Sequence, residues 1–192
     1  KELEGILDAY PEAYLNKLAH HGVNGIWLRG KLHELARVAA FPEFGLAAEP
    51  VLQDLRALVA RSARYGIKVY FYFNEPLALP QDDPFWKKYP QLQGQPHEAE
   101  HVHALCTSTP EVQSFLKDGM KDLFTRVPGL AGVILITASE FHTHCYSHFY
   151  APNGKWDETD ISKKMLCPRC RARSPQEVVG EVVRLIQDGV TA

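Results

Sequence analysis

Apolar residues follow two different spacings along this chain, and the two spacings alternate. Stretches with apolar side chains at helical spacing end at a glycine, and each is followed by a short apolar run rich in β-branched or aromatic residues. Such alternation of helices and strands is typical of a parallel sheet. The predicted helices cover 11–21, 48–65, a stretch from 110 and a last one from 174 to about 188, and the predicted strands cover 23–29, 67–73 and 132–137.

Two connections, 74–109 and 139–173, are too long for plain loops, so we expect them to be functional or to carry small elements of their own. A (β/α)8 barrel needs about 250 residues. The sequence therefore predicts one α/β domain over residues 1–192 that forms the N-terminal half of such a barrel. A smaller open α/β sandwich is the alternative. Trp27 and Tyr70 lie inside predicted strands and are expected in the core.

Composition narrows the class of protein. The 192 residues are 45% hydrophobic and 23% charged, which is ordinary for a soluble globular domain. With a net charge of −2 and no basic block, nucleic acid is not an expected partner. No apolar run approaches a membrane span of about 18 residues, and the start lacks a signal-peptide layout. We expect a cytoplasmic protein, with secretion or a periplasmic location left open, and a missing leader or upstream segment before Lys1.

Polar side chains follow each predicted strand. Because the carboxyl ends of parallel strands meet at one edge of a sheet or barrel, these side chains are candidates for a common site. Glu140 is the first candidate for a general acid and Glu75 for a second carboxylate, as glycoside hydrolysis requires. The alternative is that each glutamate pairs with an arginine or caps a helix. The expected ligand contacts are Arg29, His33, Asn74, Ser139, His142 and Tyr146.

The chain has four cysteines, and two of them form a Cys-x-x-Cys pair at Cys167 and Cys170. Beside many histidines this spacing favours zinc over structural disulfides or a redox pair. Cys145 is the expected third ligand and Cys106 the expected fourth, with His144, His142 or His148 as the alternatives for the fourth position. A closed four-ligand site would be structural, whereas an open one would activate water.

Several motifs resemble a group of bacterial barrel proteins that are distantly similar to the β-N-acetylhexosaminidase family of glycoside hydrolases. The resemblance implies a (β/α)8 domain that acts on a glycoside. In that family an Asp-Glu pair closes the fourth strand. Here Glu140 matches the acid and Ser139 stands in place of the aspartate, so Glu75 or a residue beyond Ala192 would stabilise the sugar cation. The motifs are 24–30, 41–45, 73–76, 104–108, 139–140, 143–147 and 167–170.

The favoured hypothesis is a glycoside hydrolase with a carbohydrate substrate and a zinc-stabilised loop at its active site. A non-catalytic carbohydrate-binding or zinc-stabilised interaction domain is the first alternative. A zinc-dependent hydrolase is the second, and it requires an open metal position beside Glu140. The remainder of a barrel or a second copy of the chain is the expected protein partner, because half a barrel leaves strand edges exposed.

Overall fold

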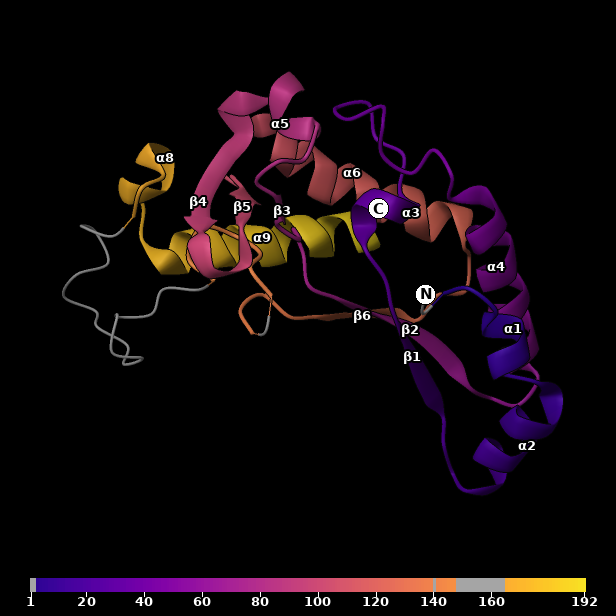
Figure 1. Ribbon diagram of the computed structural model, residues 1–192. Coiled ribbons are helices and arrows are strands. Elements are labelled where there is room, and N and C mark those ends of the chain that lie inside the picture. The colour runs from indigo at the N-terminus through magenta and orange to yellow at the C-terminus, as the bar shows by residue number, and fades with distance from the viewer. Residues whose placement is uncertain (1–2, 140, 148–164) are drawn as a thin grey trace. The chain divides into compact units, whose positions relative to one another are not determined.

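The computed structural model describes residues 3–139, 141–147 and 165–192 of a mixed α/β protein (Figure 1). The chain divides into two compact units. The first unit contains Lys1–Phe73, Asp118–Leu135 and Gly189–Ala192, and the second contains Asn74–Lys117 and Ile136–Asp188. Helices α6 (Pro110–Arg126) and α9 (Pro175–Val190) each contribute residues to both units. A single domain over 1–192 stays a prediction.

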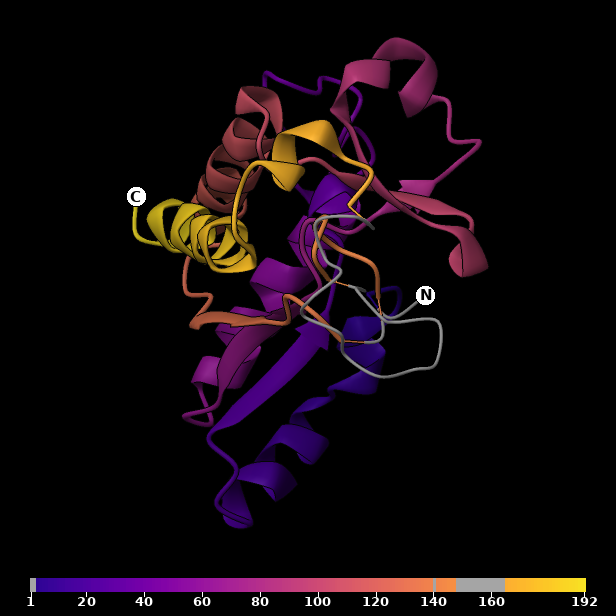
Figure 2. The ribbon, with the colours of Figure 1, turned by 90° about the vertical axis from the view of Figure 1, so that its left-hand side faces the viewer.

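The first unit is built on a parallel sheet of three strands in the order β1-β2-β6 (Figure 1 and Figure 2). These strands are β1 (Gly25–Arg29), β2 (Lys68–Phe73) and β6 (Gly132–Leu135). All three were predicted, and each is shorter by one or two residues. Parallel pairing is confirmed by a register that places Trp27 opposite Tyr70. The helices before and between the strands are α1 (Ile6–Ala9), α2 (Glu12–His20), α3 (Leu32–Leu35) and α4 (Glu49–Ala63).

One face of this sheet is buried and the other is not. Val69 and Phe71 of β2 are fully buried, and α4 contacts β2 from that side with a row of leucines spaced by three residues. On the opposite face Trp27 is 53% exposed, and its ring packs against Tyr72 with centroids 5.1 Å apart. Placing Trp27 in the core was therefore wrong, because only one face of its strand is covered. The leucines are Leu52, Leu55 and Leu58.

The second unit holds a small antiparallel sheet, which confirms that the segment 74–109 carries elements of its own. Its strands are β3 (Leu79–Pro80), β4 (Gln93–His97) and β5 (Val102–Leu105), in the order β3-β5-β4. Strand β4 lies at the edge of this sheet and pairs with β5 through an irregular register. The short helices are α5 (Phe85–Lys88), α8 (Pro168–Arg171) and 3₁₀ turns at Pro90–Leu92 and Glu98–Glu100.

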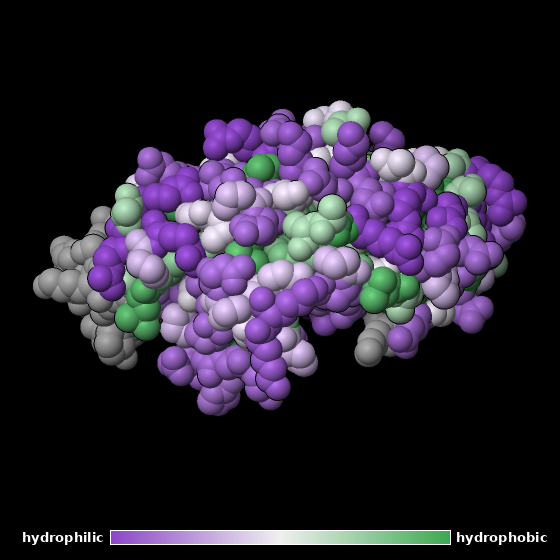
Figure 3. All heavy atoms as spheres, turned by 90° about the horizontal axis from the view of Figure 1, so that it is seen from above, coloured by the Kyte–Doolittle hydropathy of each residue, from purple (hydrophilic) through white to green (hydrophobic). Residues whose placement is uncertain are grey.

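The exposed large apolar side chains of the described residues are Tyr14, Trp27, Leu46, Ile134, Leu166 and Val183. On the face shown in Figure 3 most residues are hydrophilic, and the hydrophobic ones lie in small separate groups. Among the described residues, no helix is both long enough and apolar enough to cross a bilayer.

Candidate metal centre

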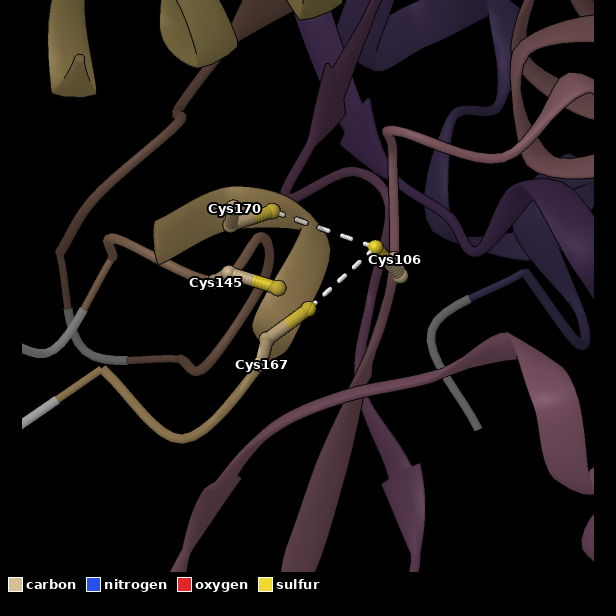
Figure 4. A group of neighbouring side chains, drawn as sticks. All are labelled: Cys106, Cys145, Cys167 and Cys170. Atoms are coloured by element: carbon tan, nitrogen blue, oxygen red, sulfur yellow. Dashed lines mark hydrogen bonds between the residues drawn. The ribbon is translucent and has the colours of Figure 1, made fainter. Parts of the chain in front are cut away.

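Four cysteine sulfurs meet in the interior of the second unit (Figure 4). All four side chains are buried, and their sulfur atoms lie within 4.8 Å of one another. The Cys106 Sγ is 3.5 Å from the Cys167 Sγ and 3.8 Å from the Cys170 Sγ. These separations are too long for a disulfide, and all four cysteines are free. A tetrahedral ion with metal–sulfur bonds of about 2.3 Å places its ligands about 3.8 Å apart, so the sulfurs fit such an ion.

Three separate segments supply the sulfurs. Cys106 directly follows β5, and Cys145 lies in the segment 141–147. Cys167 precedes α8, and its carbonyl accepts a hydrogen bond of 3.0 Å from the Arg171 amide, while Cys170 lies inside that helical turn. One turn of helix thus brings both sulfurs of the Cys-x-x-Cys pair to the same side.

The turn that carries Cys145 is held by its own side chains. The Ser147 hydroxyl accepts a 2.9 Å hydrogen bond from the Thr143 amide and lies 3.0 Å from His142 Nδ1. The other ring nitrogen of His142 donates to the carbonyl of Gln95, 2.8 Å away. The ring of His142 is 1% exposed, so this network is shielded from water. It fixes the backbone on both sides of Cys145.

Hydrogen-bond partners lie against three of the sulfurs, and one of these partners is the Ser108 hydroxyl, whose Oγ is 3.5 Å from the Cys170 Sγ. The Arg169 guanidinium donates from Nε to the Cys106 Sγ at 3.2 Å, and the backbone N–H of Gln95 donates to the Cys145 Sγ at 3.3 Å. Strand β4 approaches Cys145 closely at Gly94, where an added Cβ would lie 2.6 Å from that sulfur. Partners of this kind orient metal ligands and compensate their negative charge.

The four thiols do not titrate independently. Hydrogen bonding to Cys145, assisted by Cys170 and the Arg169 guanidinium, lowers the pKa of Cys106 to about 6. Hydrogen bonds with Cys106 and Cys145 lower the pKa of Cys167 far below its usual range. The pKa values of Cys145 and Cys170 are raised, chiefly by their hydrogen bonds with Cys106. Crowded thiols share protons in this way, and a bound cation would displace all of the protons.

Cys106 completes the cluster, so the histidines considered for the fourth position are not needed. His142 is engaged with Gln95, and His144 Nδ1 accepts a 3.1 Å hydrogen bond from the Tyr146 amide. His148 lies outside the described residues. The cluster can hold a metal ion with four sulfur ligands.

Of the two candidate acids, Glu75 lies among the described residues and Glu140 does not. Glu75 follows β2 by two residues, is 1% exposed, and accepts a 3.0 Å hydrogen bond from the Leu77 amide. Asn74 beside it is 5% exposed, and neither polar atom of its amide has a hydrogen-bond partner among the described residues. Glu140 lies outside the described residues, and Ser139 is exposed.

The other candidate ligand contacts fall into two groups. Arg29 and His33 line a cavity of about 600 Å³ in the first unit, where the His33 ring packs against Phe44. Tyr146 belongs to the buried hydrophobic cluster that surrounds the four cysteines in the second unit. Its hydroxyl lies 2.8 Å from the Cys170 carbonyl oxygen. A role in substrate binding stays a prediction for each of the six residues.

Sequence reasoning missed the residues that surround the sulfurs. Arg169 is the only one of them with a visible signal, because it stands inside the Cys-x-x-Cys pair and is carried to the cluster by the same helical turn. Gln95 donates a hydrogen bond to the Cys145 sulfur through its backbone N–H. Gly94 lets strand β4 approach the same sulfur closely because it has no Cβ. Backbone roles of this kind leave no mark on the pattern of residue types.

Comparisons with known proteins give distant structural similarity to glycoside hydrolases. No family model matches the sequence, and no curated protein matches it. A GH138 enzyme targeting pectin rhamnogalacturonan II is 14% identical with a TM-score of 0.49, over 94% of this chain and 17% of that one. The α-galactosidase from Lactobacillus brevis is 13% identical with a TM-score of 0.49, over 95% of this chain and 22% of that one. The chain thus spans about a fifth of the length of these enzymes.

Proposed function

We propose that this chain is a glycoside hydrolase-like domain in which four cysteines hold a structural zinc ion. The observation that carries the metal site is the meeting of four buried sulfurs from three segments. Thiolates are soft ligands, and a set of four sulfurs in tetrahedral arrangement suits zinc or iron. Zinc is favoured because it binds without redox chemistry, and closed sites made of four cysteines are a common structural zinc type.

A structural role follows from the ligand count. Four sulfur ligands fill a tetrahedral coordination sphere and leave no position for water or substrate. The ion would join the end of β5, the segment 141–147 and α8, which share a buried cluster around the sulfurs. Binding free energy then becomes folding free energy for this part of the chain. We therefore favour this role over a zinc-dependent hydrolase.

The proposed chemistry is cleavage of a glycosidic bond by two carboxylates. Glu75 follows the carboxyl end of a parallel strand, the position where barrel enzymes carry their catalytic groups. It is buried beside Asn74, whose side-chain amide has no hydrogen-bond partner among the described residues and would be the group that binds a sugar hydroxyl. Glu140 follows β6 and would protonate the leaving oxygen, while Glu75 would stabilise or attack the sugar cation. The parallel sheet would be the first part of a (β/α)8 barrel.

Substitution of Glu75 tests this activity. We expect Glu75→Gln to lower kcat on a responsive substrate from a panel of aryl glycosides by about 10²-fold or more, with circular dichroism unchanged. Glu111→Gln, at an exposed position of α6, is the matched control and should keep full activity. Sugar binding by calorimetry without turnover in the parent chain would instead support a carbohydrate-binding module. Full activity of Glu75→Gln would refute the assignment.

A further inference from the structure

Strand β4 is an edge strand, and its Gln95 backbone N–H and carbonyl and its Gln93 carbonyl hydrogen-bond with side chains at the sulfur cluster. The Gln95 amide donates to the Cys145 Sγ at 3.3 Å, and the Gln95 carbonyl accepts from His142 at 2.8 Å. The Gln93 carbonyl accepts from the Arg169 guanidinium at 3.0 Å. Edge strands with open donors and acceptors pair readily with other strands, so these contacts protect the edge.

Each protecting side chain is tied to the metal centre. Cys145 is itself a sulfur of the cluster, His142 precedes it by three residues in the same turn, and Arg169 lies between the other two cysteines of its helical turn. The Gln95 side chain makes a further link, because its Oε1 accepts a 2.7 Å hydrogen bond from the Leu166 amide just before Cys167. Whatever releases the sulfurs from one another would release the cover of β4 as well.

We propose that metal binding controls an interaction surface on β4, and that a second copy of this chain occupies the surface when the metal is removed. This inference rests on the proposed zinc site. Gln95 carries both an outward donor and an outward acceptor. Two β4 strands can therefore pair antiparallel about a two-fold axis centred on Gln95, with two reciprocal N–H···O bonds. A two-fold pairing of the same strand closes after two copies, so the product is a dimer.

The same contacts oppose pairing of β4 strands in the metal-loaded chain. A sulfur acceptor and an imidazole donor take the two Gln95 groups that the pairing requires. The short strand and Pro96, which lacks an N–H, limit the pairing to these groups and weaken it. The pairing is therefore suppressed while the cluster is closed and becomes available when it opens.

Two substitutions at one position test the proposal. Gln95→Pro removes the outward N–H, whereas Gln95→Ala keeps the backbone donor and removes only the side chain. Light scattering after gel filtration would measure the mass of each chain with zinc and after zinc removal by a chelator, in the presence of a phosphine reductant. We expect zinc-free wild type and Gln95→Ala to double in mass with increasing concentration, and Gln95→Pro to remain monomeric. Hydrogen exchange should show the Gln95 amide still protected in the wild-type dimer.

The outcomes separate this inference from the zinc site. A wild-type chain that loses bound zinc and remains monomeric overturns the inference and leaves the zinc site intact. Self-association that Gln95→Pro does not alter also overturns it, because another surface would be responsible. A chain that never binds zinc overturns the proposed site. The control of β4 by the metal is then overturned with it, whatever the mass of the chain.

Discussion

Replacement of Gly94 by alanine perturbs the metal centre by a single methyl group. The new Cβ would lie 2.6 Å from the Cys145 Sγ and 2.9 Å from the Ala104 carbonyl oxygen. Reaching an ordinary separation of about 3.5 Å requires a displacement of about 0.9 Å at the sulfur. Metal–ligand distances in protein sites lie within about 0.2 Å of their standard values. Gly94→Ala should therefore weaken zinc binding, and overpacking of this kind destabilises a folded protein by about 1–3 kcal/mol.

The chain offers a matched control for this substitution. Gly180 lies within α9 and has no atom within 4 Å of an added Cβ. Gly180→Ala should stabilise the fold by about 0.5–1 kcal/mol, because alanine favours a helix interior. Competition with a chromophoric zinc chelator measures affinity, and urea unfolding measures stability. Unchanged zinc affinity and stability in Gly94→Ala would refute the close approach of β4 to the sulfur.

Three further predictions concern the surroundings of the centre. Arg169→Gln should weaken zinc affinity about tenfold in the same competition assay, since it removes a donor to the Cys106 sulfur, whereas Arg171→Gln should not. Ser174→Ala should lower the free energy of unfolding at pH 7 by about 1 kcal/mol in urea titrations, because Ser174 caps α9. Hydrogen bonds from the Ser174 amide and hydroxyl lower the pKa of Glu177. This carboxylate stabilises the fold above its ordinary pKa and stops doing so as pH falls through the lowered value, so the wild-type advantage should shrink in acid-range urea titrations. Zinc removal should lower the thermal midpoint, measured by circular dichroism, by several degrees.

The three parallel strands could be predicted because local pattern and tertiary environment agree there. Phe71 and Phe73 of β2 are buried, as their apolar side chains indicate, and Gly66 lies with φ of 69° in the turn between α4 and β2. The exposure of Trp27 could not be predicted, because a strand pattern does not reveal how many faces are covered. The strands of the small antiparallel sheet escaped prediction because they are short, and because β3 and β4 contain proline or glycine.

The sulfur cluster was accessible from the sequence only in part. The spacing of Cys167 and Cys170 predicts two ligands on one helical turn, and Cys145 and Cys106 were expected to join them, but only the fold shows that the four sulfurs meet. Choosing Cys106 over the histidines depends on where each ring points, and His142 turns toward the backbone of β4. Residue types thus indicated the class of site, while the packing of three segments selected its members.

The central claim is that four cysteine sulfurs surround one zinc ion. X-ray absorption at the zinc edge of the purified chain tests it most directly, because it reports the type, number and distance of the ligands. The account predicts four sulfur neighbours at about 2.3 Å and no nitrogen or oxygen neighbour. A coordination shell with nitrogen or oxygen ligands, or a chain that carries no zinc, would contradict it.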